Sequence, residues 1–236
     1  MSFLKAEWRK LAIVNYVIEP EILSKFIPFG TEIDLWQDKC YISVVGFMFL
    51  NTKLLGIKVP FHVNFEEVNL RFYVKRLDED GWKRGVVFIK ELVPRRALSF
   101  VANLLYHENY QTLPMQHNWD INRNHITVEY QWNMEGESQR INVVAEKKPL
   151  EIKPNSEAEF ITEHYWGYAK VEDKITNEYE VTHPRWQTYK VLNFEVEIDF
   201  GRVYGIEFEF LNELKPVSVM LAEGSEITVE KRRILK

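Results

Sequence analysis

Residues 67–75 show the clearest alternation of apolar and polar positions in the chain. One face of this segment is apolar and comprises Val68, Leu70, Phe72 and Val74. The other face carries Glu67, Asn69, Arg71, Tyr73 and Lys75. Successive side chains of a β-strand point to opposite faces, so the pattern predicts a strand with one face in the core. The polar face then meets either bulk water or an enclosed polar cavity.

Several other segments have the composition of strands. They are residues 41–50, 85–93, 126–132 and 140–145. The first is apolar on both faces, as in a central strand, and the last two flank a turn at Glu135-Gly136. Asp80-Gly81 is a further turn signal. The chain is therefore predicted to contain many strands and few helices.

Three short segments carry helical signals. Residues 20–27 begin with a proline, and Pro94 precedes apolar residues at helical spacing over residues 97–105. Ser156 and Glu159 have the Ser-x-x-Glu spacing of a capping box. Because helices do not alternate regularly with strands, a parallel βαβ sheet is disfavoured. We expect an α+β, mainly β fold: one domain over residues 1–236, with an antiparallel, barrel-like sheet and two or three short helices.

The C-terminal region alternates again. Residues 194–200 and 204–210 each place apolar side chains on one face, which predicts a hairpin with Phe200 opposite Tyr204 and a loop of Gly201, Arg202 and Val203. The other face of this hairpin is acidic and carries Glu195, Glu197, Asp199, Glu207 and Glu209. Like charges directly opposite are destabilising unless cations intervene, so we expect a solvated face with lysines nearby.

Composition narrows the class of protein without giving a function. The 236 residues are 46% hydrophobic and 14% aromatic, which is enough for a large core or a lined cavity. The formal net charge of −5 argues against a general nucleic-acid binder. The single cysteine, Cys40, excludes an internal disulfide and a cysteine-based zinc site.

Targeting and cofactor motifs are absent from the sequence. No apolar run reaches the ~20 residues that span a bilayer, and charged residues interrupt the first ten positions, so we expect a cytoplasmic protein without membrane contact. Phosphate-binding and nucleophile-elbow motifs are missing, and the six histidines lack metal-ligand spacing. We therefore expect no metal and no cofactor. A homodimer remains open, since C2 dimers are the commonest soluble oligomers.

Three stretches of the chain together resemble a known family. They are Trp8 with residues 41–49 and 65–74, residues 85–88 with 109–115, and residues 160–165 with Tyr168 and residues 183–186. The Glu-x-Asn-x-Arg-x-Tyr strand and the Phe-x-Thr-Glu-x-Tyr segment are the more specific parts. The chain resembles the YqjF-like family, a domain of unknown function numbered 2071. The resemblance implies the fold of acetoacetate decarboxylase, a β-rich, barrel-like sheet around a pocket for a small acid.

The decarboxylase reaction needs a neutral lysine amine as nucleophile. In the decarboxylases two adjacent lysines follow a proline, and the matching stretch of this chain, residues 106–111, contains no lysine. Lys147-Lys148 reads as a solvated strand end. Lys90, in an apolar run, reads as a side chain with its amine in water. We therefore expect no Schiff-base chemistry.

The candidate ligand-binding residues are Glu67, Asn69, Arg71, Tyr73, Tyr110, Glu163 and His183. Arg71 offers the donor geometry of a carboxylate clamp, and Glu67 is a possible base or anchor. Tyr110 and Glu163 follow from the resemblance, and His183 is a possible acid or base near neutral pH.

Three functions remain open at this point. The first is binding of a small anionic or carbonyl-containing molecule in a pocket. The second is acid–base catalysis on a small organic acid, with Glu67 or His183 as the acid or base. The third is a non-catalytic interaction protein in which the polar face of residues 67–75 is simply hydrated.

Overall fold

The fold is built on a single sheet in the computed structural model, which describes residues 2–94 and 108–236. The strands are β1 (Leu4–Ile18), β2 (Glu32–Ile33), β3 (Cys40–Leu54), β4 (Phe65–Asp78), β5 (Gly81–Val93), β6 (Tyr110–Thr112), β7 (Met115–Ile121), β8 (His125–Met134), β9 (Glu137–Glu151), β10 (Trp166–Glu172), β11 (Ile175–Thr182), β12 (Gln187–Glu197), β13 (Ser218–Val229) and β14 (Arg233–Leu235). The described helices are η1 (Pro20–Phe26), α2 (Glu157–Thr162), α3 (Phe200–Tyr204) and η2 (Ile206–Asn212). None of these helices has the length and apolar character needed to cross a membrane.

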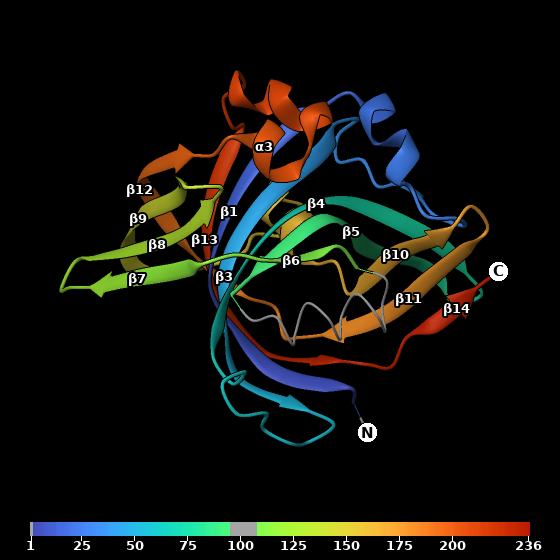
Figure 1. Cartoon of the computed structure of the whole chain (residues 1–236), viewed down its shortest axis with the longest axis horizontal. Coiled ribbons are helices and arrows are strands. Elements are labelled where there is room, and N and C mark those ends of the chain that lie inside the picture. Colours follow the sequence, from blue (N-terminus) through green and yellow to red (C-terminus); the bar gives the residue numbers. More distant parts are fainter. Residues whose placement is uncertain (1, 95–107) are drawn as a thin grey trace.

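Part of the sheet closes into a ring. Strands β13, β1, β3, β4, β5, β10 and β11 pair in that order, and a further pairing of β11 with β13, with Val181 opposite Val229, joins the two ends. Neighbouring strands of the ring are antiparallel except β5 and β10, which are parallel. Figure 1 shows the curved strands of this ring to the right of β13. The mainly β, largely antiparallel fold class is therefore confirmed.

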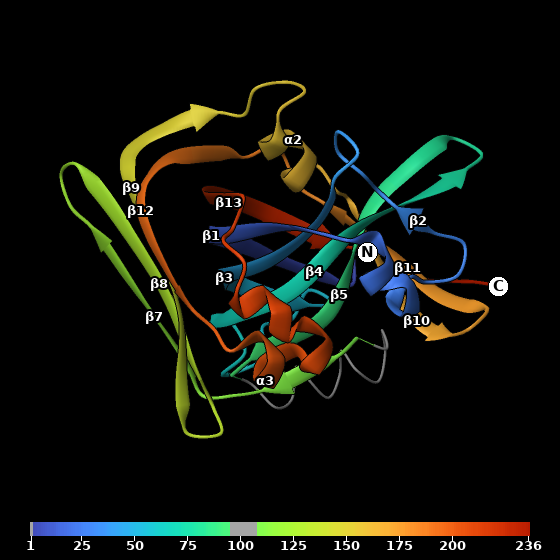
Figure 2. The same ribbon diagram turned by 90° about the horizontal axis from the view of Figure 1, so that it is seen from above.

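The remaining strands extend from the ring as a second layer. Strands β12, β9, β8 and β7 continue the sheet from β13 and project to one side (Figures 1 and 2). Their apolar side chains pack on the outer faces of β1, β3 and β4 to form the largest core. The contact is close at Gly46 of β3, where a Cβ atom would lie 2.8 Å from the Tyr130 ring of β8. A side chain larger than hydrogen at Gly46 would therefore push the two layers apart.

The two faces of β4 meet different surroundings: its apolar face packs against the second layer, and its polar face points into the ring. Val68, Leu70, Phe72 and Val74 point outward into the largest core. Glu67, Asn69, Arg71 and Tyr73 point into the ring, and their exposed fractions are 2%, 1%, 7% and 1%. The polar face is thus enclosed and not hydrated by bulk solvent. The hydrated-face premise of the third functional reading is therefore wrong for this strand.

Two of the three predicted helical segments are found in the described structure. Residues 20–26 form the 3-10 helix η1 with Pro20 at its start. Ser156 caps α2, and its Oγ accepts a hydrogen bond from the Glu159 backbone N–H at 3.2 Å. The helix predicted after Pro94 falls in residues 95–107, outside the described part of the chain.

The predicted C-terminal hairpin is wrong. Residues 200–204 form α3 and residues 206–212 form η2, while β12 pairs with β9 instead. Phe200, Val203, Tyr204, Phe208 and Leu211 are buried together, and their i, i+3, i+4 spacing is helical. The same segment also fits period two, so the hydrophobic pattern alone was ambiguous. The missed signal was Asp199, whose side chain accepts from the Arg202 backbone N–H at 3.0 Å as a helix N-cap.

Replacing the cap residue tests this helix. Asp199→Ala removes the acceptor for the Arg202 N–H and is expected to destabilise the protein by about 1 kcal/mol. Asp199→Asn keeps a side-chain oxygen at the cap and should cost far less. Urea unfolding followed by circular dichroism measures both. Equal stability of Asp199→Ala and the unmodified protein would contradict the capping role.

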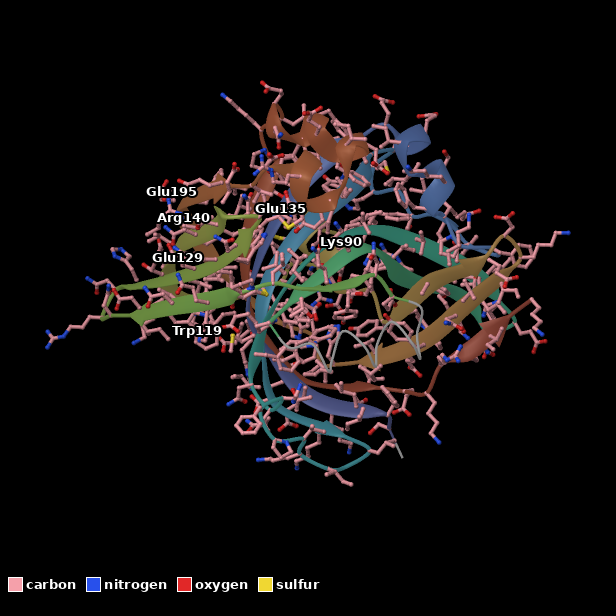
Figure 3. All side chains as sticks on the ribbon, in the orientation of Figure 1. Lys90, Trp119, Glu129, Glu135, Arg140 and Glu195 are labelled. Atoms are coloured by element: carbon pink, nitrogen blue, oxygen red, sulfur yellow. The ribbon has the colours of Figure 1, made fainter. Side chains whose placement is uncertain are left out.

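The acidic side chains of β12 form ion pairs with an arginine on the neighbouring strand β9. Arg140 of β9 donates to Glu195 at 2.7 Å and to Glu197 at 2.8 Å, and it lies 3.5 Å from Glu129. Figure 3 shows Arg140 between Glu129 and Glu195 on the outer strands. Glu207 pairs with Lys25 of η1. The predicted shared acidic face is therefore wrong together with the hairpin, and these carboxylates form separate ion pairs with Arg140 and Lys25.

Candidate functional site

A cavity of about 210 Å³ lies inside the ring. Much of its wall is aromatic or aliphatic and includes Trp8, Leu11, Phe47, Phe49, Phe65, Val86 and Phe88. Its polar part is formed by Glu67, Asn69, Arg71, Glu91, Glu108, Tyr110, His164 and Tyr179. A largely apolar wall with a few convergent polar groups is the usual composition of a small-molecule site.

The polar part follows the register of three neighbouring strands. Asn69 of β4 lies directly opposite Glu91 of β5, and Glu91 lies opposite Tyr110 of β6. Glu67 and Arg71 flank Asn69 on the same face of β4, since both are two residues away. One row of polar side chains therefore crosses the inner surface of the ring.

A β-bulge in β5 decides which of its charged residues faces the cavity. Leu70 pairs with Lys90, whereas Arg71 pairs with Phe88, so Ile89 is an extra residue in β5. Strict alternation from Phe88 would turn Lys90 inward and Glu91 outward. The bulge reverses this: Glu91 lines the cavity, and the Lys90 amine donates to the Val203 carbonyl oxygen in α3. The candidate site thus gains a carboxyl group that the sequence pattern did not identify.

Hydrogen bonds link the polar side chains in the cavity wall. Asn69 Nδ2 donates to Glu67 Oε1 at 3.0 Å, and the Tyr110 hydroxyl donates to Glu67 Oε2 at 3.3 Å. On the opposite side, the Tyr179 hydroxyl of β11 donates to Glu108 Oε1 at 2.8 Å. Within the described part of the chain, Glu67 and Glu108 are therefore held by neutral donors and form no ion pair.

In the described part of the cavity wall, three buried carboxyl groups accompany one arginine. Burial raises the pKa of Glu67 to about 7 and the pKa of Glu108 to about 8. Burial, followed by repulsion from Glu108 and Glu67, raises the pKa of Glu91 well above its ordinary value. Arg71 acts in the opposite direction on the pKa of Glu67 but does not outweigh burial. These groups therefore hold protons near neutral pH, at which ordinary glutamates are ionised.

Among the described residues, the contact that positions Arg71 is packing against Tyr73. Its guanidinium carbon lies 5.7 Å from the centre of the Tyr73 ring, and the Tyr73 hydroxyl is hydrogen-bonded to Ser43 at 2.8 Å. Within residues 2–94 and 108–236, Arg71 makes no ion pair within 4 Å, and its Nε has no hydrogen-bond partner. Tyr73 thus supports Arg71 from behind and is not part of the cavity wall.

His164 is a cavity residue that sequence reasoning did not select. Its Nε2 lies 3.2 Å from Asp34 Oδ2, and the Arg84 Nε donates to the same oxygen at 2.6 Å. Burial lowers the pKa of His164 to about 4, so the ring is neutral and its Nε2 carries the proton shared with Asp34. Nδ1 is then an acceptor. It has no partner among the described residues.

Glu163 and His183 lie outside the cavity wall. The Glu163 carboxylate accepts a hydrogen bond from the Tyr165 hydroxyl. The His183 ring stacks on Trp186 with a centroid distance of 4.3 Å and contacts Tyr165 at 4.7 Å. His183 instead lines a shallow depression that also includes Glu7. Of the predicted site residues, the structure therefore brings together Glu67, Asn69, Arg71 and Tyr110 in the cavity wall. Glu163 and His183 do not line the cavity.

No lysine lines the cavity in the part of the chain that the structure describes. Lys147 and Lys148 are exposed on β9. In the same part of the chain, no three His, Cys, Asp or Glu side chains converge in a way that could hold a metal ion.

Comparison with protein families adds an assignment to this geometry. Residues 5–226 match the model of DUF2071, whose description is an uncharacterized conserved protein. The chain belongs to the DUF2071 family. The family resemblance found in the sequence is thereby confirmed. No curated protein sequence matches this DUF2071 chain.

Solved structures share the fold of this DUF2071 protein over nearly its whole length. The enduracididine biosynthesis enzyme MppR, complexed with the condensation product of pyruvate and imidazole 4-carboxaldehyde, has a TM-score of 0.69 at 11% identity and covers 100% of this chain and 90% of its own. An acetoacetate decarboxylase-like enzyme from Sphingomonas wittichii RW1 has a TM-score of 0.68 at 10% identity, with coverages of 100% and 94%. Acetoacetate decarboxylase from Legionella pneumophila has a TM-score of 0.66 at 11% identity, with coverages of 99% and 87%. The fold relation to acetoacetate decarboxylase-like proteins is therefore confirmed.

Proposed function

We propose that this protein binds a small molecule with a carboxylate or carbonyl group inside the ring, without forming a Schiff base. The observation that supports this most strongly is Arg71, a buried guanidinium that lines the cavity and makes no ion pair within the described chain. A buried charge without a partner is costly, and a bound carboxylate or carbonyl oxygen would supply one. The aromatic wall would contact the apolar body of the ligand.

The fold neighbours are consistent with a ligand of this class. MppR, at a TM-score of 0.68 and 10% identity, has also been solved in complex with pyruvate, which is a small 2-oxo acid. At that identity the likeness concerns the fold alone. It supports the proposal only to the extent that the same ring of strands can enclose a small oxo acid.

Binding measured on Arg71 variants tests the proposal. Isothermal titration calorimetry with pyruvate and with phenylpyruvate is expected to show saturable binding to the unmodified protein. Arg71→Met should weaken it by about 30-fold, because hydrogen bonds to a charged group contribute roughly 1.5–3 kcal/mol. Arg123→Met, which removes an exposed arginine from the loop between β7 and β8, is the matched control and should change nothing. Equal affinities of Arg71→Met and the control would contradict the proposal.

Acid–base catalysis is the second candidate function, and the environment of Glu67 favours it. The pKa of this carboxyl group is raised to about 7, in the range that suits proton transfer near neutral pH. Its position on the cavity wall, beside Arg71 on β4, would set it near a carbonyl compound held by the guanidinium.

Exchange of carbon-bound protons provides the test of this second function. In heavy water, NMR should show loss of the methyl proton signal of pyruvate faster than in buffer alone. Glu67→Gln should abolish the acceleration while pyruvate still binds. Exchange at the buffer rate would reject the catalytic reading and leave the binding proposal intact.

A further inference from the structure

Two buried oxygen atoms of the cavity wall, one from Asn69 and one from Glu91, have no hydrogen-bond partner among the described residues, although the Glu91 carboxyl group also interacts with the Tyr110 hydroxyl. Asn69 Oδ1 and Glu91 Oε2 belong to residues directly opposite in the β4–β5 ladder, with exposed fractions of 1% and 2%. Neither atom has a hydrogen-bond partner within the described residues. A buried polar atom left in this state costs about 1–3 kcal/mol. A ligand that donates to Asn69 Oδ1, and beside which Glu91 ionises and accepts, would satisfy both atoms.

His164 adds a third acceptor to the same cavity. Its Nε2 is directed to Asp34, and its Nδ1 is buried and lacks a partner in the described chain. The donor atoms in the described wall that lack a partner are Arg71 Nε and Trp8 Nε1, and the Thr52 hydroxyl, which can donate or accept, lacks one as well. The His164 ring lies 4.8 Å from the ring of Tyr73, the residue on which Arg71 packs, so this acceptor lies on the Arg71 side of the cavity, whereas Asn69 Oδ1 and Glu91 Oε2 belong to the neighbouring step of the β4–β5 ladder.

The charged side chains of the cavity wall also favour a ligand that carries a hydrogen-bond donor with positive charge. Glu67, Glu91 and Glu108 line it, whereas Arg71 is the only lysine or arginine in the wall that the structure describes. The other titratable side chains in the described wall are Tyr110, Tyr179, His164 and His62. A ligand that brings a positive charge would give the carboxyl groups a counter-ion that the described part of the wall supplies only through Arg71.

We infer that the ligand carries a basic nitrogen as well as an oxygen acceptor, as an amino acid does. The nitrogen would donate to Glu91 Oε2 and Asn69 Oδ1, while the carboxylate or carbonyl oxygen would accept from Arg71. Asn69 and Arg71 are two residues apart in β4 and therefore adjacent on the same face of the strand, so the two ligand groups can be close together. This inference rests on the proposed function and narrows its ligand to molecules with both groups.

Binding of four compounds that share a phenyl-bearing body measures the contribution of the amine separately from that of the carboxylate or carbonyl group. They are phenylalanine, with an amine and a carboxylate; phenylpyruvate, with an oxo acid; 3-phenylpropanoate, with the carboxylate alone; and phenethylamine, with the amine alone. Alanine, pyruvate, propanoate and ethylamine form the matching set with a shorter body. We expect the amino acid of at least one set to bind at least 10-fold more tightly than the corresponding simple carboxylate.

Variants of Glu91 test the assigned partner. Glu91→Gln keeps the shape and removes the charge, and it should abolish the advantage of the amino acid without weakening the simple carboxylate. Glu79→Gln, at the exposed β4–β5 turn, makes the same chemical change outside the cavity and should retain the advantage. Calorimetry in two buffers of different ionisation enthalpy should also show proton release when the amino acid binds, because Glu91 ionises opposite the ammonium group.

The outcomes separate this inference from the proposed function. One outcome is that oxo acids or carboxylates bind at least as tightly as the amino acids and that their binding depends on Arg71. This would contradict the inference that the ligand carries a basic nitrogen, and it would leave the proposed function intact. An amino-acid preference that persists in Glu91→Gln would overturn the assigned partner. Absence of binding by every compound in both sets would overturn the inference and the proposed function together.

Discussion

Raising the pH from 6.5 to 8.5 is expected to lower the free energy of unfolding by about 2 kcal/mol or more. The cause is the set of buried carboxyl groups Glu67, Glu91 and Glu108, whose pKa values in the folded protein are raised mainly by burial. In the unfolded chain these groups ionise near pH 4.3. Between the two values the folded state binds more protons than the unfolded state, so stability falls as the pH rises.

The size of this loss of stability and the pH range in which it occurs follow from the coupling of proton binding to folding. Each proton held only by the folded state lowers stability by about 1.4 kcal/mol per pH unit, until the group ionises in the folded state. The loss should slow as the pH passes about 7 for Glu67 and about 8 for Glu108, the pKa values of the folded protein. His164 has the opposite sign, because its lowered pKa keeps it neutral when folded, and its effect is confined to pH values below about 6.5. Above pH 6.5 the carboxyl groups are therefore the main source of the pH dependence, and the Cys40 thiol, whose pKa burial raises to about 11, contributes with the same sign only near pH 8.5.

A glutamine variant identifies the source of the effect. Urea unfolding at pH 6.5, 7.5 and 8.5 gives the free energies. Glu108→Gln retains the oxygen that accepts from the Tyr179 hydroxyl but cannot ionise. Its stability should depend less on pH, and it should be more stable than the unmodified protein at pH 8.5. Parallel curves for the two proteins would show that Glu108 is not a source of the pH dependence.

Gly224→Ala is expected to destabilise the protein by about 3 kcal/mol or more. Gly224 has a φ of +79°, and a Cβ atom there would lie 2.0 Å from the Trp8 carbonyl oxygen on β1. Left-handed backbone costs an alanine about 1–2 kcal/mol, and the clash with backbone adds a further 1–3 kcal/mol because β1 has to move. Trp8 lines the cavity, so the displacement should also weaken ligand binding.

Gly136→Ala provides the control for this substitution. Gly136, in the β8–β9 turn, has a φ of +90°, and its Cβ position has no atom within 4 Å. Alanine should therefore cost only the backbone strain of about 1–2 kcal/mol. Thermal unfolding of the two variants separates the clash from the strain. Equal melting temperatures would contradict the close approach of β13 to β1 at Gly224.

The local pattern of the chain was a good guide where periodicity was strict. The alternation in residues 67–75 predicted β4 and its apolar face, and the Ser156–Glu159 spacing predicted the start of α2. The segment after Asp199 was misread because its apolar spacing fits both a strand and a helix. Tertiary packing against Tyr16 selects the helix, since the Phe200 ring lies 5.6 Å from the Tyr16 ring.

The candidate site was only partly accessible from sequence. Glu67, Asn69 and Arg71 could be found together because one strand carries them on one face. Glu91 could not, because a bulge inverts the alternation of β5 and no residue marks it in the sequence. His164 depends on Asp34, which is 130 positions away.

By itself, the sequence determined that residues 67–75 form a strand with one polar face, that strands dominate the chain, and that the stretch matching the decarboxylase lysines has none. These properties depend on neighbours within a few residues, which is the range of backbone periodicity. Whether the polar face met water was decided only by the pairing of β11 with β13, which closes the ring around it. That pairing joins residues about fifty positions apart. Its free energy comes from packing of the assembled strands, which no local pattern records.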